Sequence, residues 1–82
     1  MNHVFMTRQN WEKINSRYGE DITNWGLEEM YKWAISLDVS PTTGKPGWKS
    51  YREKRDHASV LINTIKRGLQ SGRITMDYKR DY

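Results

Sequence analysis

The 82-residue sequence contains no cysteine, only two prolines and no long apolar run. The lack of cysteine excludes a disulfide framework, a thiolate zinc site and a cysteine nucleophile. Because a membrane-spanning helix needs about 20 consecutive apolar residues, we expect none. The segment Met1–Met6 has neither a basic region nor an extended apolar one, so we expect no signal peptide and a location inside a cell.

Aromatic side chains are abundant, with four Trp and five Tyr among residues of which 29% are charged. This supply of large apolar groups argues against a disordered chain. The length fits one small domain, and a domain of this size buries only about 60% of its unfolded surface. We therefore expect marginal stability and a gain from binding a partner.

Apolar periodicity predicts three helices, at about residues 8–18, 24–37 and 48–71. In the first, Trp11, Ile14 and Tyr18 share one face, and Gly19 stands where a helix cap is expected. Together these helices predict an all-α fold, a single small three-helix domain over residues 1–82 with a short extended C-terminal segment.

The second predicted helix is expected to be the most buried element, because its apolar residues cover much of its circumference. Thr23 and Asn24 are suited to cap its start. Glu28 and Glu29 would then lie in its first turn, where negative charge complements the helix dipole. Glu20 and Asp21 are expected to form a short acidic connection before it.

The third predicted helix is long and carries Leu61, Ile65 and Leu69 at helical spacing. Gly68 costs about 1 kcal/mol relative to alanine inside a helix, so the helix could fray or end early there. A heptad pattern covers too little of this helix to predict a coiled coil. A homodimer formed by contact between two copies of this helix stays an alternative.

Two segments lie outside the predicted helices. Residues 38–47 hold both prolines and are expected to form an exposed loop. Gly44 and Lys45 in this loop do not have the spacing of a phosphate-binding P-loop. Residues 73–82 alternate apolar and polar side chains, and we favour an extended tail on the helices because a lone strand is unstable.

Charge is divided unevenly along the chain, whose net charge is +4. Residues 1–44 carry four basic and six acidic side chains, whereas residues 45–82 carry ten and four. The densest basic segment holds five cations: Lys45, Lys49, Arg52, Lys54 and Arg55. These cations could solubilise a helix face, bind nucleic acid or attract an acidic or amphipathic protein segment. A helix-turn-helix is disfavoured, because the loop before the third helix is long and contains both prolines.

Catalytic and metal-binding groups are scarce. His3 is near the N-terminus, and His57 is expected to be solvated on the third helix, where its neighbour Asp56 points in another direction. Glu28 and Glu29 are explained by the helix dipole. We therefore expect no enzymatic activity, no metal site and no cofactor.

The aromatic residues indicate an interaction surface, because three short elements cannot hide all of them. Trp25 and Trp33 lie off the apolar stripe of the second helix and are the leading candidates. The residues that we expect to bind a partner are Trp25, Trp33, Trp48, Tyr51, Arg52 and Arg55.

The whole chain, from Met1-Asn2-His3-Val4-Phe5 to Asp77-Tyr78-Lys79-Arg80-Asp81-Tyr82, resembles the lysis-inhibition family of the rapid-lysis III locus of T-even bacteriophages. The resemblance is to a short protein over its full length and rests on no diagnostic motif. It implies a cytoplasmic antiholin of the host cell, acting at the cytoplasmic face of the inner membrane. Such a protein binds the cytoplasmic N-terminal part of a phage holin and delays hole formation and lysis.

Two alternatives stay open beside this resemblance. One is a small basic phage protein that binds nucleic acid, whose affinity would fall steeply with salt. The other is an inhibitor of a host enzyme, which would need only an exposed surface on a helical domain. The basic half of the chain would also be attracted to anionic lipid headgroups.

Overall fold

The computed structural model describes residues 6–79, and its secondary structure is helical. The helices, in chain order, are α1 (Arg8–Tyr18), α2 (Glu20–Ala34), α3 (Gly47–Arg52) and α4 (His57–Gln70). The predicted all-α class is confirmed. The predicted number of three helices is wrong, because the segment expected to form one long third helix is divided into α3 and α4.

Helix α1 has the predicted bounds, but α2 begins at Glu20 and not at residue 24. Gly19 adopts a φ of 87°, which lets it end α1 and start α2 without a linker. Glu20 and Asp21 therefore form the first turn of α2 and are not a connection. Thr23 is not the cap, since its hydroxyl donates to the carbonyl of Gly19 at 2.7 Å from inside the helix.

The break between α3 and α4 falls at residues 53–56. Asp56 caps α4: its carboxylate accepts hydrogen bonds from the backbone N–H of Ser59 at 3.1 Å and from the Ser59 hydroxyl at 2.8 Å. Such a cap satisfies an N–H group that the first turn of a helix leaves without a helical partner. The Asp-x-x-Ser spacing was the sequence signal for this break.

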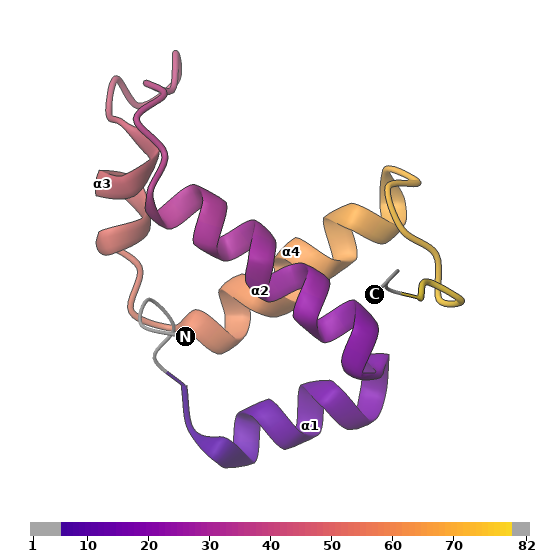
Figure 1. Ribbon diagram of the computed structural model, residues 1–82. Coiled ribbons are helices and arrows are strands. Elements are labelled where there is room, and N and C mark those ends of the chain that lie inside the picture. Colours follow the sequence, from indigo (N-terminus) through magenta and orange to yellow (C-terminus); the bar gives the residue numbers. More distant parts are fainter. Residues whose placement is uncertain (1–5, 80–82) are drawn as a thin grey trace.

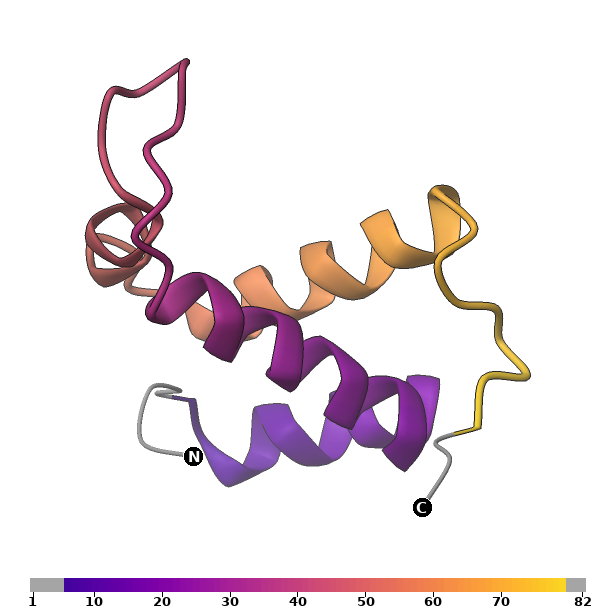
Figure 2. The same ribbon diagram turned by 45° about the horizontal axis from the view of Figure 1, so that its top comes forward.

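Helix α2 lies at the centre of the fold, in contact with α1, α3 and α4 (Figure 1). It contributes more buried residues than the other described helices, as predicted. It contacts α4 at Gly26, where an added Cβ would lie 2.6 Å from Leu61 Cδ1 and 3.0 Å from Ile65 Cγ1. Leu61 and Ile65 are fully buried at this crossing, which Figure 2 shows from a second direction.

Residues 36–48 form a projecting hairpin, which the two ribbon views place at the far end of α2 from α1 (Figures 1 and 2). Its arms are joined by backbone hydrogen bonds from Ser40 to Lys45 (3.0 Å), from Gly47 to Asp38 (2.9 Å) and from Trp48 to Ser36 (2.9 Å). The predicted loop of residues 38–47 is thus exposed but ordered by its own backbone, with one isolated bridge between Val39 and Pro46.

After α4, Gly72 adopts a φ of 77° and reverses the chain. The backbone N–H groups of Arg73 and Ile74 donate to the carbonyl of Gly68, and Ile74 is buried in the core. The predicted tail does lie on the helices. It is not extended throughout, because a hydrogen bond from Tyr78 N to Thr75 O closes a turn; positions 80–82 of this prediction lie outside the described residues.

Within residues 6–79, every helix is too short or too polar to cross a lipid bilayer.

Candidate interaction grooves beside the α2–α4 crossing

A groove of about 750 Å³ runs between α2 and α4; we call it the tryptophan groove. Helix α2 supplies Trp25, Glu29 and Trp33, which fall four residues apart and so share one side of the helix. The opposite wall comes from α4 and the chain that follows it: Thr64, Arg67, Gly68, Gln70, Ser71 and Arg73. Trp25 and Trp33 were the leading predicted candidates, and the structure brings them into one groove.

Gly68 sets the position of the Trp25 ring. A Cβ atom added at Gly68 would lie 2.7 Å from Trp25 Cζ3 and 3.2 Å from Ile74 Cγ1, so only glycine leaves room there. The glycine does not end or fray α4 as the sequence suggested it could, since α4 continues to Gln70. Its helix-propensity cost is offset by the packing of an indole directly on the helix backbone.

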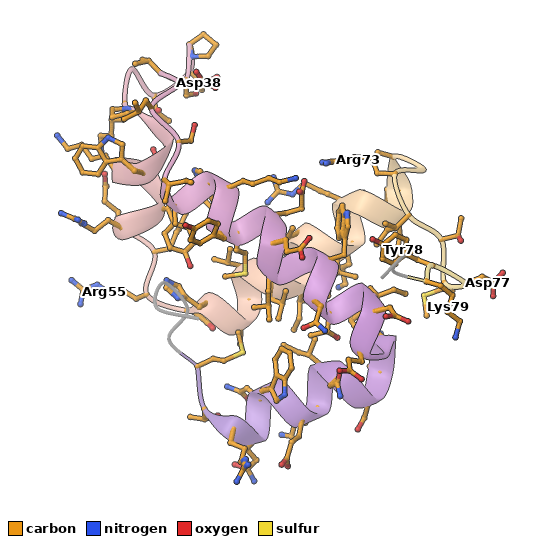
Figure 3. The ribbon with its side chains drawn as sticks, in the orientation of Figure 1. Asp38, Arg55, Arg73, Asp77, Tyr78 and Lys79 are labelled. Atoms are coloured by element: carbon orange, nitrogen blue, oxygen red, sulfur yellow. The ribbon has the colours of Figure 1, made fainter. Side chains whose placement is uncertain are left out.

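Arg73 covers the end of this groove. Its guanidinium carbon lies 5.3 Å from the centroid of the Trp25 ring, and its Nη2 donates a hydrogen bond to Glu29 Oε1. Figure 3 shows the Arg73 side chain reaching from the C-terminal segment back toward α2. Glu29 also accepts a hydrogen bond from Lys32 Nζ at 3.0 Å. These contacts fix the C-terminal segment to α2 beside Trp25.

The Glu29 side chain is only 14% exposed. Burial by itself would raise the pKa of Glu29, but hydrogen bonds from Lys32 and Arg73 outweigh it and hold that pKa below its ordinary value. The carboxylate therefore stays ionised at neutral pH, and its charge is already compensated by two cations.

A second groove of about 810 Å³, here called the basic groove, lies between the hairpin, the α3–α4 connection and α4. Lys45, Lys54 and Arg55 line it, and it shares Trp33 and Arg67 with the tryptophan groove. The two grooves therefore meet at Trp33 and Arg67 and form one continuous surface.

Each carboxylate of the basic groove already accepts hydrogen bonds from within the protein. Lys45 Nζ donates to Glu53 Oε1 at 2.8 Å and lowers the pKa of that carboxyl. Hydrogen bonds from the backbone and hydroxyl of Ser59 lower the pKa of Asp56. Across both grooves, five cationic side chains face three carboxylates: Lys45, Lys54, Arg55, Arg67 and Arg73 against Glu29, Glu53 and Asp56. The continuous surface therefore carries an excess of positive charge around its tryptophans.

Tyr51 was predicted to be an exposed residue that binds a partner, but the structure places it in the core. Its side chain is only 5% exposed, and burial raises its pKa. The ring packs edge-on against Trp33, with centroids 5.3 Å apart at 75°, and lies 4.9 Å from the ring of His57. Helical spacing alone could not separate this core position from a surface one, because α3 is too short to show a clear period.

The remaining predicted residues lie apart from the tryptophan groove. Trp48 is half-buried on α3, with the guanidinium carbon of Arg52 at 5.3 Å from its ring centroid. Arg52 is exposed. Arg55 is exposed at the edge of the basic groove and points away from the helices (Figure 3).

His57, expected to be solvated, is only 3% exposed. It is the first residue of α4, and the chain turn at Asp56 directs its ring inward against Tyr51. The expectation failed because a continuous helix through positions 53–56 would have placed His57 on the polar face. Among residues 6–79, no three His, Asp or Glu side chains are grouped as a metal ion would require.

Sequence reasoning missed the three charged residues that line the tryptophan groove: Glu29, Arg67 and Arg73. Glu29 was assigned to a first turn because α2 was predicted to begin too late; it lies mid-helix between the two tryptophans. The four-residue spacing of Trp25, Glu29 and Trp33 was the signal available. No sequence pattern indicates that Arg73 belongs to the groove, because it is the chain reversal at Gly72 that brings Arg73 back to α2.

The fold and the grooves together define a small all-α protein with a cationic, tryptophan-lined surface suited to binding another molecule. Comparison with known proteins adds no relative: no protein-family model matches this chain, and neither a curated protein nor a solved structure is significantly similar to it.

Proposed function

We propose that this protein is a cytoplasmic antiholin: it binds the cytoplasmic N-terminal part of a phage holin in the tryptophan groove and so delays hole formation and lysis. The observation that carries the binding site is the pair of tryptophans on one side of α2, facing Arg67 and Arg73 across the groove. The identity of the partner follows from the resemblance of the whole chain to the lysis-inhibition family of T-even phages.

The dimensions of the groove suit an amphipathic helix. Trp25 and Trp33 are eight residues apart, which is about 12 Å along α2. Apolar side chains two turns apart on a docking helix have the same spacing, so they can contact the parts of the two half-buried indoles that remain exposed. Acidic side chains at the edge of that helix would meet the excess of cations, which speeds encounter and fixes orientation.

The mechanism we propose is sequestration. A holin segment held along α2 and α4 would have its apolar face covered, and that face would no longer be available for contacts between holin subunits. Dissociation from the groove would restore the holin to assembly. Such control needs no chemical step by the protein, which agrees with the expectation that it is not an enzyme.

Binding of nucleic acid is the weaker alternative. Base stacking needs accessible ring faces, but Arg52 lies over Trp48 and Arg73 lies over Trp25. Inhibition of a host enzyme would use the same grooves, with a different partner.

The test is capture of tagged protein from phage-infected cells, with and without nuclease treatment, read by mass spectrometry. The proposal expects the holin to co-purify in both lysates and to be lost with the Arg67→Glu variant. The control is Lys66→Glu, an equal charge change at an exposed position outside both grooves. Nucleic-acid-binding proteins lost on nuclease treatment, or a host enzyme in place of the holin, would contradict it.

A further inference from the structure

The hairpin of residues 36–48 exposes apolar side chains in the middle of the sequence, well separated along the chain from residues 6 and 79. Leu37, 79% exposed, and Val39, 62% exposed, have the two highest exposures among the large apolar side chains of residues 6–79. Leu37 and Val39 flank Asp38 on the first arm of the hairpin, which is bonded to the second arm at Ser36, Asp38 and Ser40. Figure 3 places Asp38, which separates them, at the projecting end of the molecule.

The surroundings of this apolar pair are cationic. Residues 29–53 contain four basic side chains, Lys32, Lys45, Lys49 and Arg52, and three acidic ones, Glu29, Asp38 and Glu53. Lys32 is paired with Glu29 and Lys45 with Glu53, so Lys49 and Arg52 are the cations outside these two pairs. Trp48, the last residue of the hairpin, is half-buried. Exposed aliphatic side chains, flanking lysines and a neighbouring tryptophan are the features of segments that enter the interface of an anionic membrane.

We propose that the hairpin is a docking site for an anionic lipid surface. Leu37 and Val39 would enter the boundary between headgroups and acyl chains, while Lys49 contacts lipid phosphates. A second copy of the chain fits this surface less well, since a two-fold interface would bring Lys49 close to the same cation of the other copy. The proposal is independent of the holin partner, because it uses neither Trp25 nor Arg67.

The test is sedimentation of the full chain with vesicles made of equal parts phosphatidylglycerol and phosphatidylcholine, and with vesicles of phosphatidylcholine alone. We expect binding to the anionic vesicles only, weakened by salt. The double variant Leu37→Ser, Val39→Ser should bind about tenfold less, because two exposed apolar groups no longer enter the bilayer. Lys49→Gln should bind roughly fivefold less.

Matched control variants distinguish binding through this site from nonspecific binding of the protein to vesicles. Met76 is also an exposed apolar residue, at 59%, but lies in the C-terminal segment; Met76→Ser should bind as the unchanged protein does. Lys66→Gln is the control for charge. Circular dichroism should show equal helix content in all variants, because Leu37 and Val39 are outside the core.

Direct evidence of insertion is accessible because the chain has no cysteine. An environment-sensitive fluorophore attached to Val39→Cys should shift its emission to shorter wavelength on anionic vesicles, whereas the same fluorophore on Met76→Cys should not. Absence of binding to anionic vesicles would overturn the proposal. It would also be overturned by equal binding to neutral ones, or by equal losses in the Leu37, Val39 variant and the Met76 control.

Discussion

The indole of Trp25 packs directly on the backbone of Gly68, so a side chain of α2 fills the space that a side chain of α4 would occupy. Arg73, brought back by the reversal at Gly72, covers the outer face of the same ring. Trp25 is thereby held between α4 and the C-terminal segment. This arrangement forms the end of the tryptophan groove, where Trp25 contacts both α4 and the C-terminal segment.

Gly68→Ala should destabilise the protein, against the usual direction. Alanine in a helix is favoured over glycine by about 1 kcal/mol. Here its Cβ would lie 2.7 Å from Trp25 Cζ3, and overpacking of this kind costs about 1–3 kcal/mol. Denaturant unfolding followed by circular dichroism measures the net loss.

A double-mutant cycle isolates the cause of that loss. In a Trp25→Leu background the clash is removed, so Gly68→Ala should become neutral or stabilising. Equal effects of Gly68→Ala in both backgrounds would show that the ring does not determine the requirement for glycine.

Glu29 should make the stability of the protein depend on pH. A carboxyl whose pKa is lower in the folded state contributes stability above its unfolded pKa and loses it as the pH falls through the folded pKa. Glu29→Gln should therefore be less stable by roughly 1 kcal/mol at neutral pH. The difference should shrink as the pH falls below 4.5, the ordinary value for this group.

Unfolding midpoints of both proteins across the acid range measure this difference. Glu12→Gln is the control, since Glu12 is 66% exposed in a surface pair with Arg8 at 3.8 Å. A pH-independent gap between Glu29→Gln and the unchanged protein would contradict ionisation as the source of the effect.

Tyr51 and Trp48 should respond very differently to truncation. Tyr51→Ala removes a buried ring that supports both Trp33 and His57, and should cost about 3–5 kcal/mol, enough to unfold much of a small domain. Trp48 is half-buried beneath Arg52, so Trp48→Ala should cost clearly less. Comparable losses in thermal unfolding of the two variants would mean that Tyr51 is not the core residue of this pair.

The cap at Asp56 should control where α4 begins. Asp56→Ala removes the acceptor for Ser59 and should lower the unfolding midpoint by several degrees, whereas Asp56→Asn keeps an acceptor oxygen and should retain most of the stability. Because the Ser59 hydrogen bonds lower the pKa of Asp56, the loss in Asp56→Ala should diminish in acid. Identical midpoints for the Ala and Asn variants would exclude a capping role.

Regular periodicity made part of this fold predictable. The bounds of α1 followed from the spacing of Trp11, Ile14 and Tyr18 and from Gly19, and the structure confirms them. The start of α2 was missed because Thr23 and Asn24 have the composition of a cap, while a glycine corner at Gly19 leaves no linker to recognise.

The grooves were only partly predictable, because they depend on contacts between distant segments. Trp25 and Trp33 could be placed off the apolar stripe of α2 from spacing alone. The burial of Tyr51 and His57 could not, since it depends on the chain turn at Asp56. The position of Arg73 beside Glu29 links residues 44 positions apart, and no local pattern encodes it.

Titration of a labelled peptide of the holin's cytoplasmic N-terminal segment into the 82-residue protein tests the central claim most directly. Arg67 is the residue to vary, because Trp33 also supports Tyr51 and its truncation would disturb the core. The account predicts saturable binding that weakens about tenfold in Arg67→Glu and is unchanged in Lys66→Glu. Absence of binding would contradict the holin partner, and equal weakening in both variants would contradict the tryptophan groove as its site.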